Sequence, residues 1–194
     1  IGIPMFAQRI AVISSETAAG YGDFCAQLAD NPYGFQFRTR LFPAVMQGEM
    51  VEESIIDALD SINAEIEEFD VVVIIRGGGA TSDLSGFDTL ALAENVANFP
   101  LPVITGIGHD RDESVLDMIS CVRVKKPTAA ADFLISNLAA TLAHIEDLGH
   151  RLVNHIKERL SEEKVRISAT QTLLPTLYYK RKARETDTIS RLSA

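Results

Sequence analysis

Residues 71–79, VVVIIRGGG, constrain the fold more than any other segment of the chain. The run opens with five consecutive β-branched residues, so it has no polar face, and a strand of this kind must be buried on both faces of a sheet. Parallel sheets covered on both faces by helices have this requirement, and they place their binding sites at the carboxyl ends of the strands. The segment therefore predicts an α/β domain with a site that begins at Arg76.

The chemistry of the RGGG motif suits an anion. Glycines lack a Cβ atom, which lets the backbone turn sharply and approach a ligand closely. The guanidinium of Arg76 is always charged and presents a planar fork of donors that matches phosphate oxygens. For the motif taken alone, the alternative is a Gly-rich turn next to a solvated arginine.

Three further apolar segments alternate with helical patterns and extend this α/β prediction. We expect strands at 9–14, 35–42 and 101–107 in addition to the one that starts at Val71, with helices near 18–30, 48–66, 89–98 and 114–119. An order of strands separated by helices predicts a Rossmann-like, mostly parallel sheet flanked by helices. Because the carboxyl ends of parallel strands share one edge, the turns that follow residues 14, 76 and 107 should converge.

A long helix is predicted to follow this domain. Apolar residues recur at helical spacing from residue 129 to 160, and Leu138, Ile145 and Leu152 stand at intervals of seven, an imperfect heptad pattern. We therefore expect an α/β catalytic domain over residues 1–128 and a helical, coiled-coil extension over 129–194, interrupted at Pro175. An amphipathic helix cannot bury its own apolar stripe, so a partner helix and an oligomer are expected.

Composition excludes some classes of protein. No apolar run approaches the length of a membrane span, so we expect no membrane segment. Cys25 and Cys121 lack the spacing of a metal or redox motif, which favours the reducing cytoplasm. Residues 1–113 hold 5 Lys/Arg against 18 Asp/Glu, a net charge of −13, whereas residues 114–194 hold 13 against 9, a net charge of +4. This balance does not favour non-specific binding to a polyanion by the first part of the chain.

The loop after residue 107 carries the best candidates for acid–base chemistry. His109 and Asp112 stand three residues apart, a spacing at which a carboxylate can orient an imidazole and stabilise its protonated form. The alternative is that Asp112 caps the next helix and His109 is a surface residue. Asp23, His109, Asp110 and Asp112 are also suitable ligands for a divalent ion such as Mg²⁺, although their spacing does not establish a metal site.

Candidate phosphate contacts lie at the same predicted edge. We assign them to Ser14, Ser15, Gly77, Gly78, Gly79, Lys126 and Thr128. For the two serines the alternative is a helix-capping role, and for the basic cluster of Arg123, Lys125 and Lys126 it is a solvated surface.

Taken together, the motifs resemble the large subunit of exodeoxyribonuclease VII, a bacterial nuclease of single-stranded DNA. The resemblance covers roughly residues 5–140 and is carried by RIAVISSETAAGYGDF at 9–24, LFPAVMQGE at 41–49, VVVIIRGGGATSDLSGFD at 71–88 and VITGIGHDRDESVLDMISCVRVKKPTAAAD at 103–132. It implies catalytic roles for the matching residues Asp23, Arg76, His109 and Asp112.

The resemblance also has implications for the organisation of the protein. It implies an OB-type single-strand-binding domain before residue 1, and a coiled coil that binds small subunits, of which residues 129–194 would be a shortened root. The chain departs from the family pattern at Glu16, Ala18, Ser85, Asp88 and Asp110.

The resemblance, together with the residue patterns, leaves two functions to consider. The first is an exonuclease subunit that hydrolyses phosphodiester bonds in single-stranded DNA, with Arg76 stabilising charge on phosphorus, His109 transferring a proton and Asp112 orienting it. The second is a non-catalytic Rossmann-like module that binds a nucleotide or sugar phosphate. The module would need Arg76 and the glycines but not His109 or Asp112, so it would bind a mononucleotide without cleaving oligonucleotides.

Overall fold

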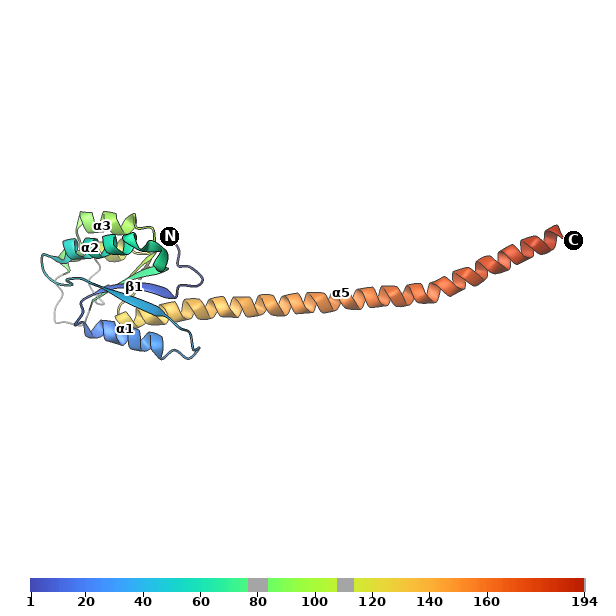
Figure 1. The fold of residues 1–194 in the computed structure, drawn as a ribbon, viewed down its shortest axis with the longest axis horizontal. Coiled ribbons are helices and arrows are strands. Elements are labelled where there is room, and N and C mark those ends of the chain that lie inside the picture. Colours follow the sequence, from blue (N-terminus) through green and yellow to red (C-terminus); the bar gives the residue numbers. More distant parts are fainter. Residues whose placement is uncertain (77–83, 108–113, 194) are drawn as a thin grey trace. The chain divides into compact units, whose positions relative to one another are not determined.

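The computed structural model describes residues 1–76, 84–107 and 114–193. Within these ranges the elements follow a β-α order, with short 3₁₀ turns η1 and η2 beside the longer helices (Figure 1). In chain order they are β1 (Arg9–Ser14), α1 (Ala19–Ala29), β2 (Arg38–Pro43), α2 (Val51–Ala64), η1 (Ile66–Glu68), β3 (Val71–Ile75), η2 (Ser85–Phe87), α3 (Leu90–Ala97), β4 (Val103–Gly106), α4 (Val115–Ile119), β5 (Val122–Arg123) and α5 (Pro127–Leu192).

The described strands form one parallel sheet in the order β2-β1-β3-β4-β5. The α/β fold class with a parallel sheet and a helical extension is therefore confirmed. The sequence did not predict β5, because a strand of two residues is too short to show any periodicity.

The segment β3 occupies the centre of the sheet, as its composition required. It pairs with β1 on one side and β4 on the other, and all five of its residues are buried. Each such Val or Ile side chain contributes about 1.5–3 kcal/mol when it is removed from water. This strand therefore links the two hydrophobic layers of the domain.

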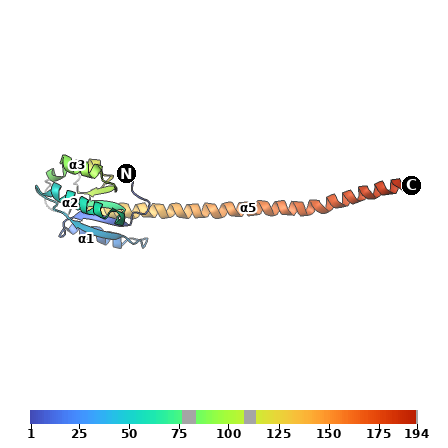
Figure 2. The same ribbon diagram turned by 45° about the horizontal axis from the view of Figure 1, so that its top comes forward.

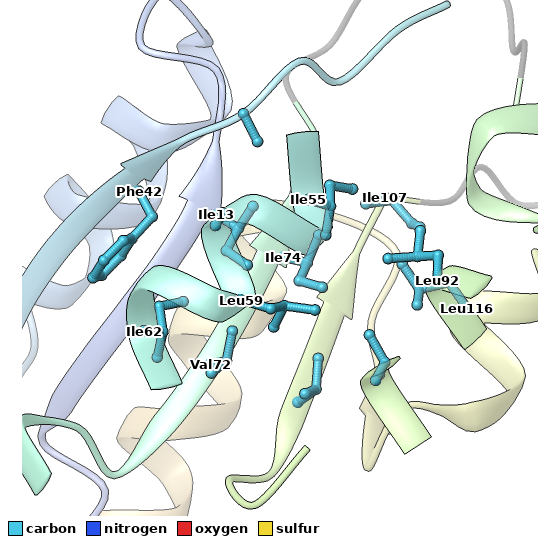
Figure 3. Packing of buried hydrophobic residues seen from close by; sticks show 14 of the residues in the cluster. Ile13, Phe42, Ile55, Leu59, Ile62, Val72, Ile74, Leu92, Ile107 and Leu116 are labelled. Atoms are coloured by element: carbon cyan, nitrogen blue, oxygen red, sulfur yellow. The ribbon is translucent and has the colours of Figure 1, made fainter. Parts of the chain in front are cut away.

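Helices cover both faces of the sheet (Figures 1 and 2). On one face, α2, α3 and α4 pack over alternate strand residues, and Figure 3 shows this layer, with Ile74 of β3 among side chains of α2. On the other face, α1 and the beginning of α5 cover the remaining alternate residues through Phe24, Leu28, Ala131 and Leu134. The period of two along each strand divides the core in this way.

The predicted start of β2 differs from the structure for a local reason. Strand β2 begins at Arg38 rather than residue 35, because the Asn31 side chain holds the preceding residues in a turn. Its Oδ1 accepts hydrogen bonds from the backbone N–H groups of Tyr33 and Phe35, and its Nδ2 donates to the Phe35 carbonyl. An Asx turn of this kind competes with strand pairing.

Helix α5 runs through Pro175, so the predicted interruption is wrong. Proline removes one backbone donor, and at an exposed position the carbonyl that loses its partner can bond to water.

The chain divides into two compact units, residues 1–142 and 143–194. Ala130 to Thr141 contribute buried residues to the first unit, whereas every described residue of the second is exposed.

By length and composition, α5 contains a stretch apolar enough to cross a membrane, which the sequence analysis did not expect. A third of that stretch is buried inside the folded chain. Core helices of soluble proteins meet the same criterion, so it supports no membrane assignment.

At the opposite end of the strands, Asp70 fastens β1 to β3. Its carboxylate accepts hydrogen bonds from the backbone N–H groups of Gln8 and Arg9 at 3.1 and 2.8 Å, and from Nη2 of Arg9 at 2.6 Å. Burial acts to raise the pKa of Asp70, but these donors outweigh it and hold the pKa below its usual value. The depressed pKa means that folding favours the ionised form.

This linkage predicts acid sensitivity that depends on Asp70. A carboxyl group with a depressed pKa in the folded state contributes stability above its unfolded pKa of about 3.9, and loses it as the pH falls through the folded value. Thermal melts of the unsubstituted chain should therefore shift downward below about pH 4. Asp70→Asn should lower the melting temperature at pH 7 and make it less sensitive to pH below 4, whereas Asp57→Asn, on the exposed side of α2, should change neither.

Candidate functional site

The carboxyl ends of β1 and β3 lie side by side at the point where the strand order reverses. From β1 the chain passes outward to β2, then returns to β3 on the other side of β1. Extending the pairing of Ile13 with Ile74 by one residue places Ser14 beside Ile75. Ligands of open α/β sheets bind at such a switch point, outside the carboxyl ends of the strands.

Arg76 follows β3 at this edge. Its backbone N–H donates to the Gly106 carbonyl at 3.4 Å, which continues the pairing of β3 with β4. The residue is only 7% exposed, and its Nη1 atom has no hydrogen-bond partner among the described residues. The alternative of a solvated arginine is therefore wrong. A buried guanidinium nitrogen without a partner is costly, and an anionic ligand would satisfy it.

Ser14 closes β1 with a side chain that is fully buried. Its Oγ atom has no partner among the described residues, and in the alternation of β1 it belongs to the face covered by α1 and α5. The predicted capping alternative is wrong, because the N-cap of α1 is Ala18 and no side chain caps it. Ser15 is half-buried, and its Oγ lies 3.3 Å from Oγ1 of Thr17.

Helix α5 begins at the same edge, close to β4. A Cβ atom built on Gly106 would lie 3.1 Å from Cγ2 of Ile75 and 3.6 Å from the carbonyl carbon of Lys126, so glycine permits this close approach. The Lys126 carbonyl accepts the first helical hydrogen bond, from Ala129 at 3.0 Å. The positive end of the helix dipole therefore lies at the edge, beside the exposed Lys126 and the half-buried Thr128.

Asp23 is exposed on α1, and one contact shows which part of α5 it faces. Gln27 donates a hydrogen bond through Nε2 to Oδ1 of Asp132 at 2.8 Å, which sets the two helices in register. Asp23 lies four residues before Gln27, and Thr128 lies four residues before Asp132. Residues four apart share a helix face. Asp23 and Thr128 therefore lie on the helix faces that meet at Gln27 and Asp132, about one helical turn nearer the carboxyl edge of the sheet than that contact.

Several predicted site residues lie outside the described residues, namely Gly77, Gly78, Gly79, His109 and Asp112. The residues that flank them are described: Arg76 and Leu84 on one side, Ile107 and Ser114 on the other. The N-cap of α4 is Ser114, which forms a capping box with Asp117, so the capping role considered for Asp112 belongs to Ser114.

Asp117 is a charged residue near this edge that the sequence analysis missed. It is buried, its Oδ2 accepts from Oγ of Ser114 at 3.0 Å, and Nε of Arg123 lies 3.9 Å away. Arg123, a member of the basic cluster, thus forms an ion pair with a buried carboxylate and is not simply solvated. The S-x-x-D spacing of a capping box was the signal in the sequence.

No group of three or more His, Cys, Asp or Glu side chains suited to a metal ion occurs within residues 1–76, 84–107 and 114–193. Of the four ligands considered for Mg²⁺, Asp23 is the one that lies in the described ranges. The metal remains a prediction.

Comparison with known proteins shows similarity along the whole chain. Residues 2–194 match the family model "Exonuclease VII, large subunit". The chain is 33% identical over 194 residues to the exodeoxyribonuclease 7 large subunit of Lactobacillus acidophilus, covering 98% of this chain and 42% of that protein. It is 31% identical over 189 residues to that of Lactobacillus helveticus, with 95% and 42% covered, and 40% identical over 138 residues to that of a Nostoc species, with 71% and 32% covered. The chain thus spans less than half the length of these relatives.

Ser14 offers a direct test of the switch-point site. Ser14→Ala should leave the melting temperature unchanged or slightly higher, because the hydroxyl is buried without a partner in the described structure. If the hydroxyl binds phosphate, affinity for a deoxynucleoside monophosphate should fall by about twofold to tenfold, the usual effect of one hydrogen bond. Calorimetric titration measures the affinity of the unsubstituted chain and of Ser14→Ala for the nucleotide. Ser61→Ala, on the exposed side of α2, is the control.

Proposed function

Because the chain belongs to the exonuclease VII large-subunit family, we propose that it supplies the catalytic α/β domain of a nuclease that hydrolyses phosphodiester bonds in single-stranded DNA. The observation that carries this proposal is the pair of buried donors, Ser14 Oγ and Arg76 Nη1, that have no hydrogen-bond partner among the described residues and lie at the switch point of a parallel sheet. Both are buried hydrogen-bonding groups, and a phosphate group is an acceptor suited to both.

In this proposal Arg76 stabilises the negative charge that develops on the phosphoryl oxygens. Its burial lowers the local dielectric constant and strengthens that interaction relative to water. The start of α5 adds a positive dipole end, with Lys126 and Thr128 as further phosphate contacts. The site would thereby bind phosphate despite the acidic composition of residues 1–113.

Proton transfer is assigned to residues outside the described ranges. His109 would transfer a proton to the leaving oxygen or from the attacking water, and Asp112 would orient its imidazole. Asp23 would position the water, or Mg²⁺ if the reaction uses a metal ion. The alternative function, a non-catalytic nucleotide-binding module, is not favoured by the family match.

The second unit of the chain is the proposed site of assembly. A large subunit belongs to a multi-subunit enzyme, and we assign small-subunit binding to the exposed apolar residues of residues 143–194. They include Ile145, Leu148, Leu152, Ile156 and Leu160, all of them at least 46% exposed. We place the enzyme in the cytoplasm, in keeping with two free cysteines, Cys25 and Cys121.

Substitution of Arg76 tests the proposed reaction. In the full-length, assembled protein, Arg76→Ala should lower kcat on a fluorescent single-stranded oligonucleotide by about a hundredfold or more, the usual cost of a lost transition-state contact. Arg76→Lys should lower kcat similarly, because lysine cannot present the bidentate fork of donors. His109→Ala should also abolish cleavage.

Arg40→Ala is the matched control and should leave cleavage unchanged, because Arg40 on β2 forms an exposed ion pair with Glu65, the residue that follows α2. Cleavage assays with and without a chelator would test the metal separately. Near-normal activity of either Arg76 variant would refute the assignment, and tight mononucleotide binding without cleavage by the unsubstituted assembly would support the binding module instead.

The assembly proposal predicts that charge on the apolar stripe prevents association. Leu148→Asp with Leu152→Asp should leave the α/β unit folded by circular dichroism but abolish co-purification with the small subunit, because each buried leucine contributes about 1.5–3 kcal/mol. Asn154→Asp with Ser161→Asp adds the same charge about 180° around the helix from Leu152 and should preserve association. Light scattering measures the outcome, and a stable complex of the double leucine variant would contradict the assignment.

A further inference from the structure

Hydrogen bonds connect the two segments that precede residues 77–83 and 108–113, and another connects the two segments that follow them. Before the two stretches, β3 and β4 are neighbouring strands, and the N–H of Arg76 donates to the Gly106 carbonyl. After them, Oδ1 of Asp88 accepts a hydrogen bond from the backbone N–H of Val115 at 2.7 Å. This second bond connects residues 27 positions apart in the chain.

The position of Asp88 is itself fixed by close packing. A Cβ atom on Gly86 would lie 2.7 Å from Cβ of Val51, so η2 rests directly on the first residue of α2. Phe87 is fully buried in the core, and the Asp88 N–H bonds to the Ser85 carbonyl at 3.1 Å. The Asp88 carboxylate therefore projects from an anchored turn.

Its partner, Val115, is the first residue of α4. The N–H of a first helical residue has no acceptor within its own helix. Two other donors at the start of α4 have partners within the capping box: Oγ of Ser114 accepts from the Asp117 N–H at 3.2 Å, and Oδ2 of Asp117 accepts from the Ser114 N–H at 3.3 Å. Leu116 is fully buried, and Figure 3 shows it beside Leu92 of α3. Asp88 thus completes the start of α4 from a different segment of the chain.

We propose that Asp88 is a positioning residue of the nuclease: it fixes the start of α4, the helix that follows His109 and Asp112 in the chain. We call the hydrogen bond between Asp88 and Val115 the tether. This inference rests on the proposed function, because it explains the tether by the need to position the groups of that site. A displacement of about 1 Å in a catalytic group is sufficient to reduce a rate about a hundredfold. Asp88 touches neither substrate nor reacting atoms in this account.

Three variants of the full-length, assembled protein test the proposal. Asp88→Ala removes the acceptor and should lower kcat on a single-stranded oligonucleotide by about tenfold to a hundredfold, with KM changed by less than about threefold, because the phosphate contacts remain. Asp88→Asn keeps a carbonyl oxygen at the same place and should restore kcat to within about threefold of the unsubstituted protein. Thr89→Ala removes the adjacent cap of α3, whose Oγ1 accepts from the Leu92 N–H, and should leave kcat unchanged.

Hydrogen exchange of the Val115 amide gives a readout that is independent of cleavage. Exchange should accelerate at least tenfold in Asp88→Ala and stay slow in Asp88→Asn and Thr89→Ala. Unchanged exchange in Asp88→Ala would overturn the tether, and equal loss of kcat in Asp88→Ala and Thr89→Ala would overturn the positioning role. If the unsubstituted assembly did not cleave DNA, the proposed nuclease function would fail, and with it the purpose assigned to Asp88, while the exchange rates would still decide whether the tether exists.

Discussion

The burial of β3 on both faces is the constraint on which the rest of this structure depends. A strand without a polar face must lie inside a sheet that is covered on both sides, so α2 and α3 pack on one face while α1 and the start of α5 pack on the other. Parallel connections then bring the carboxyl ends of all described strands to one edge. The edge that carries the candidate site is thus a consequence of core packing.

At that edge the fold buries two polar side chains, Ser14 and Arg76. Ser14 is fully buried and Arg76 is nearly so, yet each keeps a hydrogen-bonding atom without a partner in the described structure. Such groups reduce stability, and the surrounding hydrophobic burial offsets the loss. Ser14 ends β1 and Arg76 follows β3, so both lie at the switch point, and this position supports the proposal that the edge binds a ligand.

Helix α5 connects a folded domain with the proposed surface for assembly. Its first turns supply Ala130, Ala131 and Leu134 to the core, and its beginning contributes a dipole to the candidate site. Its later residues carry exposed leucines and isoleucines in a separate compact unit. One helix thereby joins the proposed catalytic edge to the proposed subunit contacts.

Local sequence patterns determined the features that depend on neighbouring residues: the strands 9–14 and 71–75, the start of α3 near Thr89, the parallel α/β class and the placement of Arg76 at a strand end. The tertiary structure alone decided the features that depend on residues distant in the chain. Ser14 is buried without a partner among the described residues, Asp70 joins β1 to β3, and Asp88 bonds to the start of α4. Strand β5 exists because β4 offers it a pairing edge, since two residues have no pattern of their own. The physical reason is that periodicity and capping act within a few residues, whereas hydrogen bonding and desolvation depend on which segments the fold brings together.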